Sequence, residues 1–290
     1  MLKWGDQTVE LSPAVGGSIA RYTIDVGGRS VDLLRPTGPA ATEVLDFACF
    51  PLVPYSSRIR AGQFQFEGRD IRLTLNFGDH PHSIHGHGWQ APWSVTEQNA
   101  SSATLDYLHQ ADAWPWAYRA RQRFVLDEQG LLVKLSLTNL AETRMPAGLG
   151  LHPYFPRARS AHLKASVNSV WRMDHEVMPI ERIALPPDLP LWSGVSLAEV
   201  VLDNGFEGWD RIAEIAWPTS GIGLNVTASP ELSRLVVYAP AGQDFFCVEP
   251  VSHMTDAFNR AAQGDAETGL RVLAPQDTFS AWMRLSPRRL

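Results

Sequence analysis

Histidines crowd one short segment of the chain, where their spacing raises the question of metal chemistry. The segment GDHPHSIHGHGWQAPW carries His80, His82, His85 and His87, and imidazole is a common ligand of transition metals. On an extended chain, however, the first two lie on one face and the last two on the opposite face. The carboxylate of a cupin-type site is also displaced, since the first one downstream is Glu97. We therefore expect no bound metal, and we expect two of the four imidazoles to cap loop backbone.

Four further polar residues stand near the ends of apolar runs, where a side chain needs either a partner or a function. Glu249 ends the run in DFFCVEP, and His152 follows the glycine-broken strand in GLGLHPYFP. Arg58 follows a proline-rich run, so its planar guanidinium either braces a loop or grips an oxygen-rich ligand. Asp203 precedes an Asn-Gly pair, which by itself favours a turn cap. A lone histidine of this kind is more often structural than catalytic, so each residue taken singly leaves both interpretations open.

Strands must position these residues, because alternating apolar and polar residues recur along the whole chain. LLVKLSLTN, residues 131–139, puts four apolar side chains on one face, as in a half-buried strand. Residues 62–76 show the same alternation on both sides of a Glu-Gly turn, which predicts a hairpin. SLAEVVL, residues 196–202, is the best helical candidate. Many short strands and no boundary predict an all-β protein, a large antiparallel β-sandwich formed by one domain over residues 1–290.

Composition limits the partners and the compartment. Hydrophobic residues make up 44% and charged residues 19% of the 290, which is ordinary for a globular protein. The net charge is −6 and the sequence has no lysine/arginine block, so nucleic acid and anionic membranes are poor partners. The N-terminus lacks the apolar core of a signal peptide, and Cys49 and Cys247 suggest neither a metal motif nor a disulfide framework. We expect a cytoplasmic protein, and its oligomeric state is left open.

Five segments of the chain, taken together and in order, resemble the aldose 1-epimerases, which are also called galactose mutarotases. The segments are SSRIRAGQF, HSIHGHGW, LHPYFP, LDNGFEGWD and CVEPVSHMTDAFN. The resemblance implies a large β-sandwich that interconverts the α and β anomers of free sugars and uses no cofactor. The residues that it assigns to the site are Arg58, His85, His152, Asp203 and Glu249.

The resemblance gives these five residues roles in opening a sugar ring. An ionised Glu249 suits removal of the proton from the anomeric hydroxyl, and a protonated His152 suits delivery of a proton to the ring oxygen. His85 would hydrogen-bond the ring oxygen or help to hold charge. Arg58 and Asp203 would bind hydroxyl groups of a small-molecule sugar substrate.

Two departures from the family pattern concern the sugar rather than the acid–base pair. Ser57 stands where the family often has asparagine, and His87 interrupts the glycine pair in HGHG. Aromatic rings near the motifs fit a sugar site, because the CH faces of a pyranose pack on them; the candidates are Trp89, Trp93 and Trp209. Most of the ten tryptophans are expected in the core.

Two alternatives stay open beside a mutarotase that acts on a neutral aldose. One is a sugar-binding protein without activity on the same fold, which would have no need of an acid–base pair. The other is a hexose-phosphate epimerase, which needs a basic cradle for the phosphate. Arg58, Arg60, Arg69 and Arg72 are close in sequence, although the alternation of the hairpin would spread them over two faces.

Overall fold

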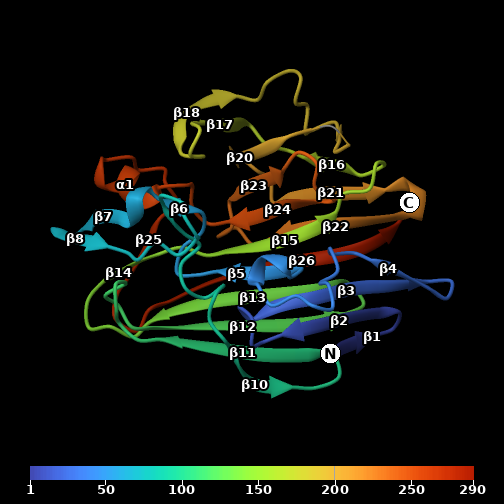
Figure 1. Ribbon diagram of the computed structural model, residues 1–290, viewed down its shortest axis with the longest axis horizontal. Coiled ribbons are helices and arrows are strands. Elements are labelled where there is room, and N and C mark those ends of the chain that lie inside the picture. Colours follow the sequence, from blue (N-terminus) through green and yellow to red (C-terminus); the bar gives the residue numbers. More distant parts are fainter. Residues whose placement is uncertain (199) are drawn as a thin grey trace.

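The computed structural model describes residues 1–198 and 200–290. Within them the chain is almost entirely β and forms two large antiparallel sheets (Figure 1), as the sequence predicts. The 11-stranded sheet runs in the order β1 (Leu2–Trp4), β2 (Gln7–Ser12), β3 (Ser18–Val26), β5 (Cys49–Leu52), β15 (Gly150–Pro156), β24 (Phe245–Val251), β23 (Arg234–Ala239), β20 (Leu202–Glu207), β17 (Ser169–Met173) and β18 (Pro179–Ala184), with β4 (Arg29–Asp32) paired to β3.

The second sheet has nine strands. Its order is β10 (Ser94–Gln98), β11 (Ser102–His109), β12 (Tyr118–Asp127), β13 (Gly130–Asn139), β26 (Thr278–Arg289), β22 (Ile222–Ala228), β21 (Ile212–Trp217), β16 (His162–Ala165) and β19 (Val195–Ser196). Three two-stranded sheets complete the β-structure: β14 (Met145–Ala147) with β25 (Arg271–Leu273), β6 (Arg58–Ile59) with β9 (Ser83–Ile84), and β7 (Gln63–Phe66) with β8 (Arg69–Arg72).

The main core lies between the two large sheets. The four apolar residues that the alternation of residues 131–139 points to one side are fully buried there, so this prediction is confirmed: Leu131, Val133, Leu135 and Leu137. The hydroxyl of Tyr22 on β3 reaches the carbonyl of Leu285 on β26 at 3.4 Å, which joins one sheet to the other. Burial of such a continuous apolar layer is the main stabilising contribution to a sandwich.

The other face of the 11-stranded sheet carries a smaller apolar cluster of its own. It is formed by Val44, Phe50, Leu52, Ile84, Trp89, Tyr154, Cys247 and Val251. The β6–β9 pair covers this face, tied down by a bridge between Val53 and Gly86. This covered outer face, and not the core between the sheets, receives the polar residues discussed below.

Of the local predictions, the structure confirms a hairpin and contradicts a helix and a turn. The hairpin of residues 62–76 is confirmed as β7 and β8, with Glu67 and Gly68 at positive φ in the turn. The helix expected over residues 196–202 is wrong for the described part of that segment, since Ser196 ends β19 and Leu202 begins β20; residue 199 lies outside the described residues. The Asn-Gly pair after Asp203 makes no turn either, because β23 pairs with it residue by residue.

Helices are short within the described residues. They are the α-helix α1 (Ala257–Ala262) and three 3₁₀ turns, η1 (Val44–Asp46), η2 (Arg60–Gly62) and η3 (Pro218–Ser220). In Figure 1, α1 lies beside β7 and β8 at one end of the molecule. Over the described ranges, no helix combines the length and the apolar character that crossing a membrane requires.

Candidate active site

His152 and Glu249 face each other on neighbouring central strands. The β15–β24 register pairs Gly150 with Val251. His152 and Glu249, two residues further along each strand, are therefore cross-strand neighbours on the outer face. Their side chains are only 8% and 5% exposed, and His152 Nε2 lies 3.4 Å from Glu249 Oε1. Two residues that are 97 positions apart in sequence thus form one buried titratable pair.

Asp203 and Arg58 form a second charged pair beside the first. Asp203 lies on β20, two strands from Glu249, and its Oδ2 is 3.6 Å from Nη2 of Arg58. Arg58 belongs to the covering strand β6, and its backbone carbonyl accepts a hydrogen bond from the N–H of Asp256 at 2.9 Å. The arginine therefore reaches down from the cover toward the sheet, with its side chain 15% exposed. A guanidinium held in this way keeps donors free for an oxygen-rich ligand.

His85 is oriented by its own loop. Its φ of 60° lies in the left-handed region, and its Nδ1 accepts the N–H of Ser57 at 3.0 Å. An imidazole that accepts at Nδ1 carries its proton at Nε2 when neutral, so His85 can donate a hydrogen bond from that atom. Its ring centroid is 5.3 Å from that of His152, nearly perpendicular to it. The donor thus lies beside the titratable pair.

A single cavity of about 390 Å³ joins these groups. All five residues assigned from sequence line it, so the structure brings together Arg58, His85, His152, Asp203 and Glu249. Aromatic walls are also present, but of the three tryptophans considered from sequence only Trp89 is among the lining residues. Trp93 and Trp209 are buried elsewhere, with their indole N–H groups bonded to backbone carbonyls.

Sequence reasoning missed several lining residues, of which Arg35 is the most important. Its guanidinium carbon lies 4.1 Å from the centroid of Tyr154, whose ring stacks on His152 at 4.8 Å. Tyr238 and Gln243 also line the cavity and were not assigned from sequence. Arg35 follows an apolar run and precedes a proline, the same context that drew attention to Arg58, so a signal was present.

Comparison with known proteins identifies the family. A family model described as aldose 1-epimerase matches residues 7–286. The chain belongs to the aldose 1-epimerase family. The uncharacterised protein YphB of Escherichia coli K12 is 32% identical over 278 residues, which cover 93% of this chain and 92% of YphB.

Solved structures agree on the fold. A crystallised Escherichia coli K12 protein, provisionally named an aldose 1-epimerase, superimposes with a TM-score of 0.91 at 30% identity, covering 100% of this chain and 98% of that one. A galactose mutarotase-like protein from Clostridium acetobutylicum gives 0.87 at 18% identity over 99% and 94% of the two chains, which supports the fold alone. The expected galactose mutarotase-like β-sandwich is therefore confirmed.

Burial governs the protonation states of the titratable side chains in this cavity. Desolvation, reinforced by the Asp203 carboxylate, raises the pKa of Glu249 well above its ordinary value, while Arg58 opposes the rise. Desolvation lowers the pKa of His152 to about 3, and Arg35 and Arg58 add to the effect. The pKa of His85 is likewise well below its usual value because of burial and the neighbouring imidazole. Burial in the cavity therefore favours a neutral carboxylic acid beside neutral imidazoles.

The four clustered histidines do not converge on one point. His80 Nε2 accepts from Arg58 Nε at 3.4 Å, and His82 Nδ1 accepts a backbone N–H at 3.1 Å. His85 lines the cavity, whereas His87 stacks on His109 at 4.5 Å. The parity argument is wrong in its premise, because His85 and the following glycine have positive φ and the chain is not extended there. Three of the four imidazoles accept a backbone N–H, one more than the two expected, namely His80, His82 and His85.

Among the residues that the structure describes, two groups of side chains have ligand atoms close enough to hold a metal ion. One is His152 and Glu249 of the cavity with the buried Cys247 beside them, and the other is His87, His109 and Asp112. Burial raises the pKa of the Cys247 thiol well above its ordinary value, so the first group offers a protonated thiol rather than a thiolate. The absence of a cofactor stays a prediction.

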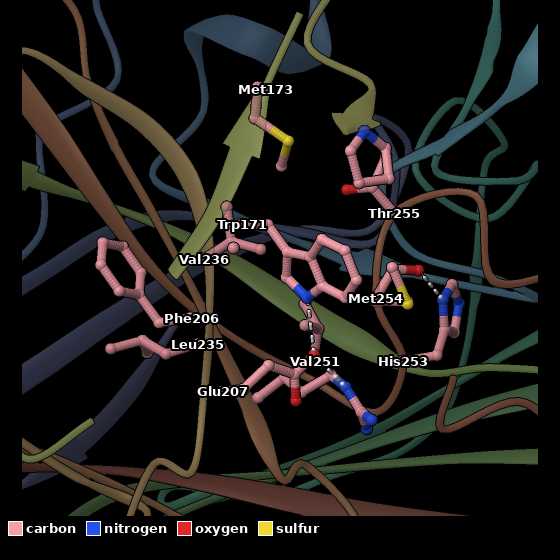
Figure 2. A pocket seen from close by; sticks show the side chains of 13 residues that line it. Trp171, Met173, Phe206, Glu207, Leu235, Val236, Val251, His253, Met254 and Thr255 are labelled. Carbon is pink, nitrogen blue, oxygen red and sulfur yellow. Dashed lines mark hydrogen bonds and ion pairs between the residues drawn. The ribbon is translucent and has the colours of Figure 1, made fainter. Parts of the chain in front are cut away.

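A second pocket, shown in Figure 2, is too small for a sugar. It encloses about 10 Å³, roughly the room of one water molecule, and residues of β17, β20 and β23 are among those that line it. Its charged groups already have partners, since Arg234 Nε and Trp171 Nε1 both donate to Glu207 Oε1, at 2.9 and 3.0 Å. This region is a packed structural contact.

Proposed function

We propose that this protein is an aldose 1-epimerase that interconverts the α and β anomers of a free, neutral aldose. The observation that carries the proposal is the contact between two buried titratable groups, His152 and Glu249, at the floor of a cavity of about 390 Å³. Family membership supports the reaction class, and the names of the relatives leave the activity of this chain to be measured.

Ring opening needs a base and an acid on two oxygens of the same sugar. Glu249 takes the proton of the anomeric hydroxyl as the bond between C1 and the ring oxygen breaks, and the electrons of the O1–H bond form the carbonyl. His152 gives its proton to the departing ring oxygen. Rotation about C1–C2 then presents the other carbonyl face, and closure returns each proton to its donor. General acid–base groups of this kind are each worth about 10²–10⁴ in rate.

The pKa shifts of His152 and Glu249 require one further step in the mechanism. They favour the pair with its proton on Glu249, whereas the proposed reaction starts with that proton on His152. The two forms differ only by transfer across the 3.4 Å contact and have the same net charge. A sugar hydroxyl that donates to Glu249 stabilises the carboxylate, and so does the nearby Arg58. Substrate binding thus selects the reactive form.

The remaining groups bind the sugar in this proposal. His85 donates from Nε2 to the ring oxygen or to the developing alkoxide, because its Nδ1 is occupied by the Ser57 amide. Arg58 and Asp203 bind hydroxyl groups as donor and acceptor. The ring of Trp89 packs against the CH face of the pyranose.

The direct test follows the optical rotation of anomerically pure sugars. We expect the protein to accelerate the approach to equilibrium for at least one neutral aldose in a panel that includes glucose, galactose, xylose and arabinose. A sugar that binds, by calorimetry, without any acceleration would identify the protein as the sugar-binding alternative without activity.

Arg35 is the observation that favours a phosphorylated substrate instead. It lines the sugar cavity and also an adjoining open hollow of about 380 Å³, where it lies with Asp46. A phosphate normally meets two or more cations. Of the four arginines considered from sequence, only Arg58 is among the described residues that line the cavity, and it is already paired with Asp203. We therefore expect glucose or galactose to react faster than glucose 6-phosphate at equal concentration, and the reverse would establish the hexose-phosphate epimerase.

A further inference from the structure

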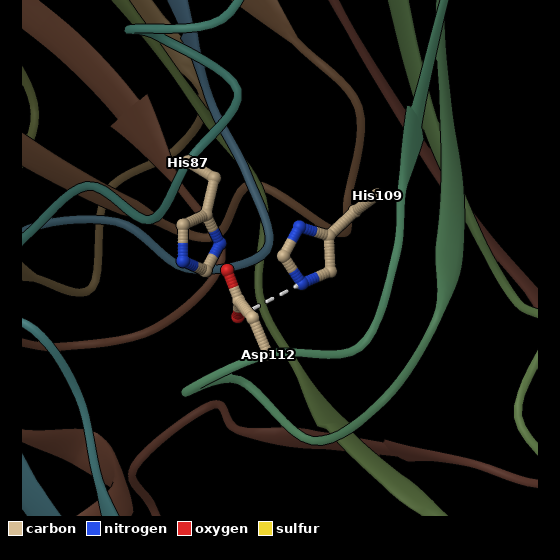
Figure 3. A group of neighbouring side chains, drawn as sticks. All are labelled: His87, His109 and Asp112. Atoms are coloured by element: carbon tan, nitrogen blue, oxygen red, sulfur yellow. Dashed lines mark ion pairs between the residues drawn. The ribbon is translucent and has the colours of Figure 1, made fainter.

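Two imidazoles and a carboxylate meet outside the sugar cavity (Figure 3). His109 is the last residue of β11, Asp112 lies in the loop after it, and His87 follows β9. One ligand atom from each of the three lies within 4.8 Å of the others. His109 Nε2 is 3.4 Å from Asp112 Oδ1, and the two side chains are 5% and 57% exposed. The cluster is therefore anchored in the protein on one side and open to solvent on the other.

The spacing of His109 and Asp112 matches one edge of a coordination tetrahedron. Zinc bonds to imidazole nitrogen and carboxylate oxygen are roughly 2.0–2.2 Å long, which puts neighbouring ligand atoms about 3.3–3.5 Å apart. The observed 3.4 Å falls in this range. The carbonyl oxygen of Trp114 is also 3.4 Å from His109 Nε2, so a further oxygen lies at the same edge.

His87 supplies the second observation that points to a ligand. Its Nδ1 is buried and has no hydrogen-bond partner among residues 1–198 and 200–290. Buried polar atoms without a partner are uncommon and costly. A buried imidazole nitrogen that is left without a partner is therefore a candidate metal ligand, since imidazole is a common ligand of divalent transition metals.

We propose that His87, His109 and Asp112 form a binding site for a divalent transition-metal ion of the zinc class. Two imidazoles and one carboxylate are a common ligand set for such ions, with the remaining positions open to water. The site is independent of the proposed function, since none of the three residues lines the sugar cavity.

Binding requires one local rearrangement. The rings of His87 and His109 are stacked, 4.5 Å apart and 16° from parallel. A nitrogen lone pair lies in the plane of its ring, so two stacked rings cannot both point at one ion. His109 already directs Nε2 toward Asp112 and is held by stacking on Tyr118 at 4.7 Å. The ring of His87 must therefore turn about its Cβ–Cγ bond, and its Nδ1 breaks no described hydrogen bond in doing so.

The test titrates Co²⁺ into the untagged, metal-free full chain and records calorimetry and the visible absorption spectrum. We expect one equivalent to bind with the intense bands of low-coordinate cobalt. Asp112→Asn should weaken binding at least about tenfold. It keeps an oxygen acceptor for the Trp114 N–H, which Asp112 Oδ1 now accepts at 2.8 Å, so the variant should fold. His109→Gln should abolish binding, and His162→Gln, which changes an exposed histidine on β16, should leave it intact.

Other results would overturn the proposal. A thiolate-to-cobalt band in the near ultraviolet would assign the ion to a cysteine instead, with Cys247 beside His152 and Glu249 as the candidate. Unchanged affinity in Asp112→Asn, with a circular dichroism spectrum like that of the parent, would exclude Asp112 as a ligand. Failure of Co²⁺ to bind the parent protein at millimolar concentration would identify the cluster as an aromatic stack with a structural role.

Discussion

Two regions of different construction enclose the sugar cavity. The floor consists of His152, Glu249 and Asp203, which stand on strands of the 11-stranded sheet. The wall consists of Arg58 and His85, which come from the β6–β9 cover and its loops. Backbone ladders on both sides fix the strands at His152 and Glu249, and one ladder fixes Asp203. Single hydrogen bonds, such as that from Ser57 N to His85 Nδ1, orient the wall.

The floor and the wall should therefore contribute differently to the reaction. A strand buried between neighbours holds a side chain more precisely than a loop does, and proton transfer tolerates little displacement. Loops tolerate substitution, which suits residues that distinguish one sugar from another. We therefore expect substitutions in the floor pair to lower kcat, and substitution of the binding residue Arg58 in the wall to raise KM with smaller changes in kcat.

The largest effect should come from Glu249→Gln. The amide keeps the shape of the side chain but cannot accept the proton of the anomeric hydroxyl, so kcat should fall by about 10²–10⁴. Sugar affinity should stay within a few-fold of the parent value. Polarimetry measures the rate and calorimetry the affinity, with circular dichroism as the check on folding. A near-parental rate in the folded variant would exclude Glu249 as the base.

His152→Asn should lower kcat by a similar or somewhat smaller factor, about 10²–10³. Asparagine retains a hydrogen-bond donor for the ring oxygen, so it can still polarise that atom without transferring a proton. The double variant with Glu249→Gln should be little slower than the slower single variant, because the two residues act as a unit. Multiplied effects in the double variant would contradict a shared proton and would split the floor pair into independent groups.

The pH profile of kcat/KM should lack the fall near pH 6.5 that a histidine with an ordinary pKa would cause on acidification. Because the pKa of His152 is lowered to about 3, a second proton does not reach the pair as pH falls through 6.5, the ordinary histidine value. Because the pKa of Glu249 is raised, the pair loses its one proton only above the ordinary carboxyl range. In the free enzyme kcat/KM should thus not fall as the pH drops through 6.5, and should decline on the alkaline side. A fall in kcat/KM centred near pH 6.5 on acidification would show that the imidazole titrates normally.

In the wall, Arg58→Lys should raise KM about tenfold and change kcat little. Lysine keeps the charge but loses the planar fork that binds two oxygens at once, and about 1.4 kcal/mol corresponds to a factor of ten. Arg72→Lys is the matched control, since Arg72 is exposed on β8 and is not among the described cavity residues. A large loss of kcat in Arg58→Lys would move this arginine from binding to catalysis.

Sequence patterns predicted the sandwich and five residues that line one cavity, but not the rest of the cavity lining. The alternation of β13 and the five family segments carried these predictions, because strand periodicity and sequence order survive folding unchanged. Contacts between segments that are distant in sequence could not be predicted. No pattern shows that residue 109 lies against residue 87 or that Arg35 borders the cavity. Two local signals were overruled by strand pairing, which took the Asn-Gly pair into β20 and ended the expected helix of residues 196–202.

The smallest effect should come from Ser57→Asn, which restores the residue that the family often has before its arginine. Ser57 has a φ of 56°, a conformation that asparagine adopts more readily than serine. The substitution also removes the hydrogen bond between the Ser57 and Thr255 hydroxyls, at 2.8 Å. These contributions oppose each other, at roughly 1 kcal/mol each, so the free energy of unfolding should change by less than about 1 kcal/mol. Because the backbone N–H of residue 57 still orients His85, kcat should stay within about twofold, while the ratio of KM values for galactose and glucose should shift. A large fall in kcat would show that substitution at residue 57 displaces His85 and disturbs the chemistry, and not only the choice of sugar.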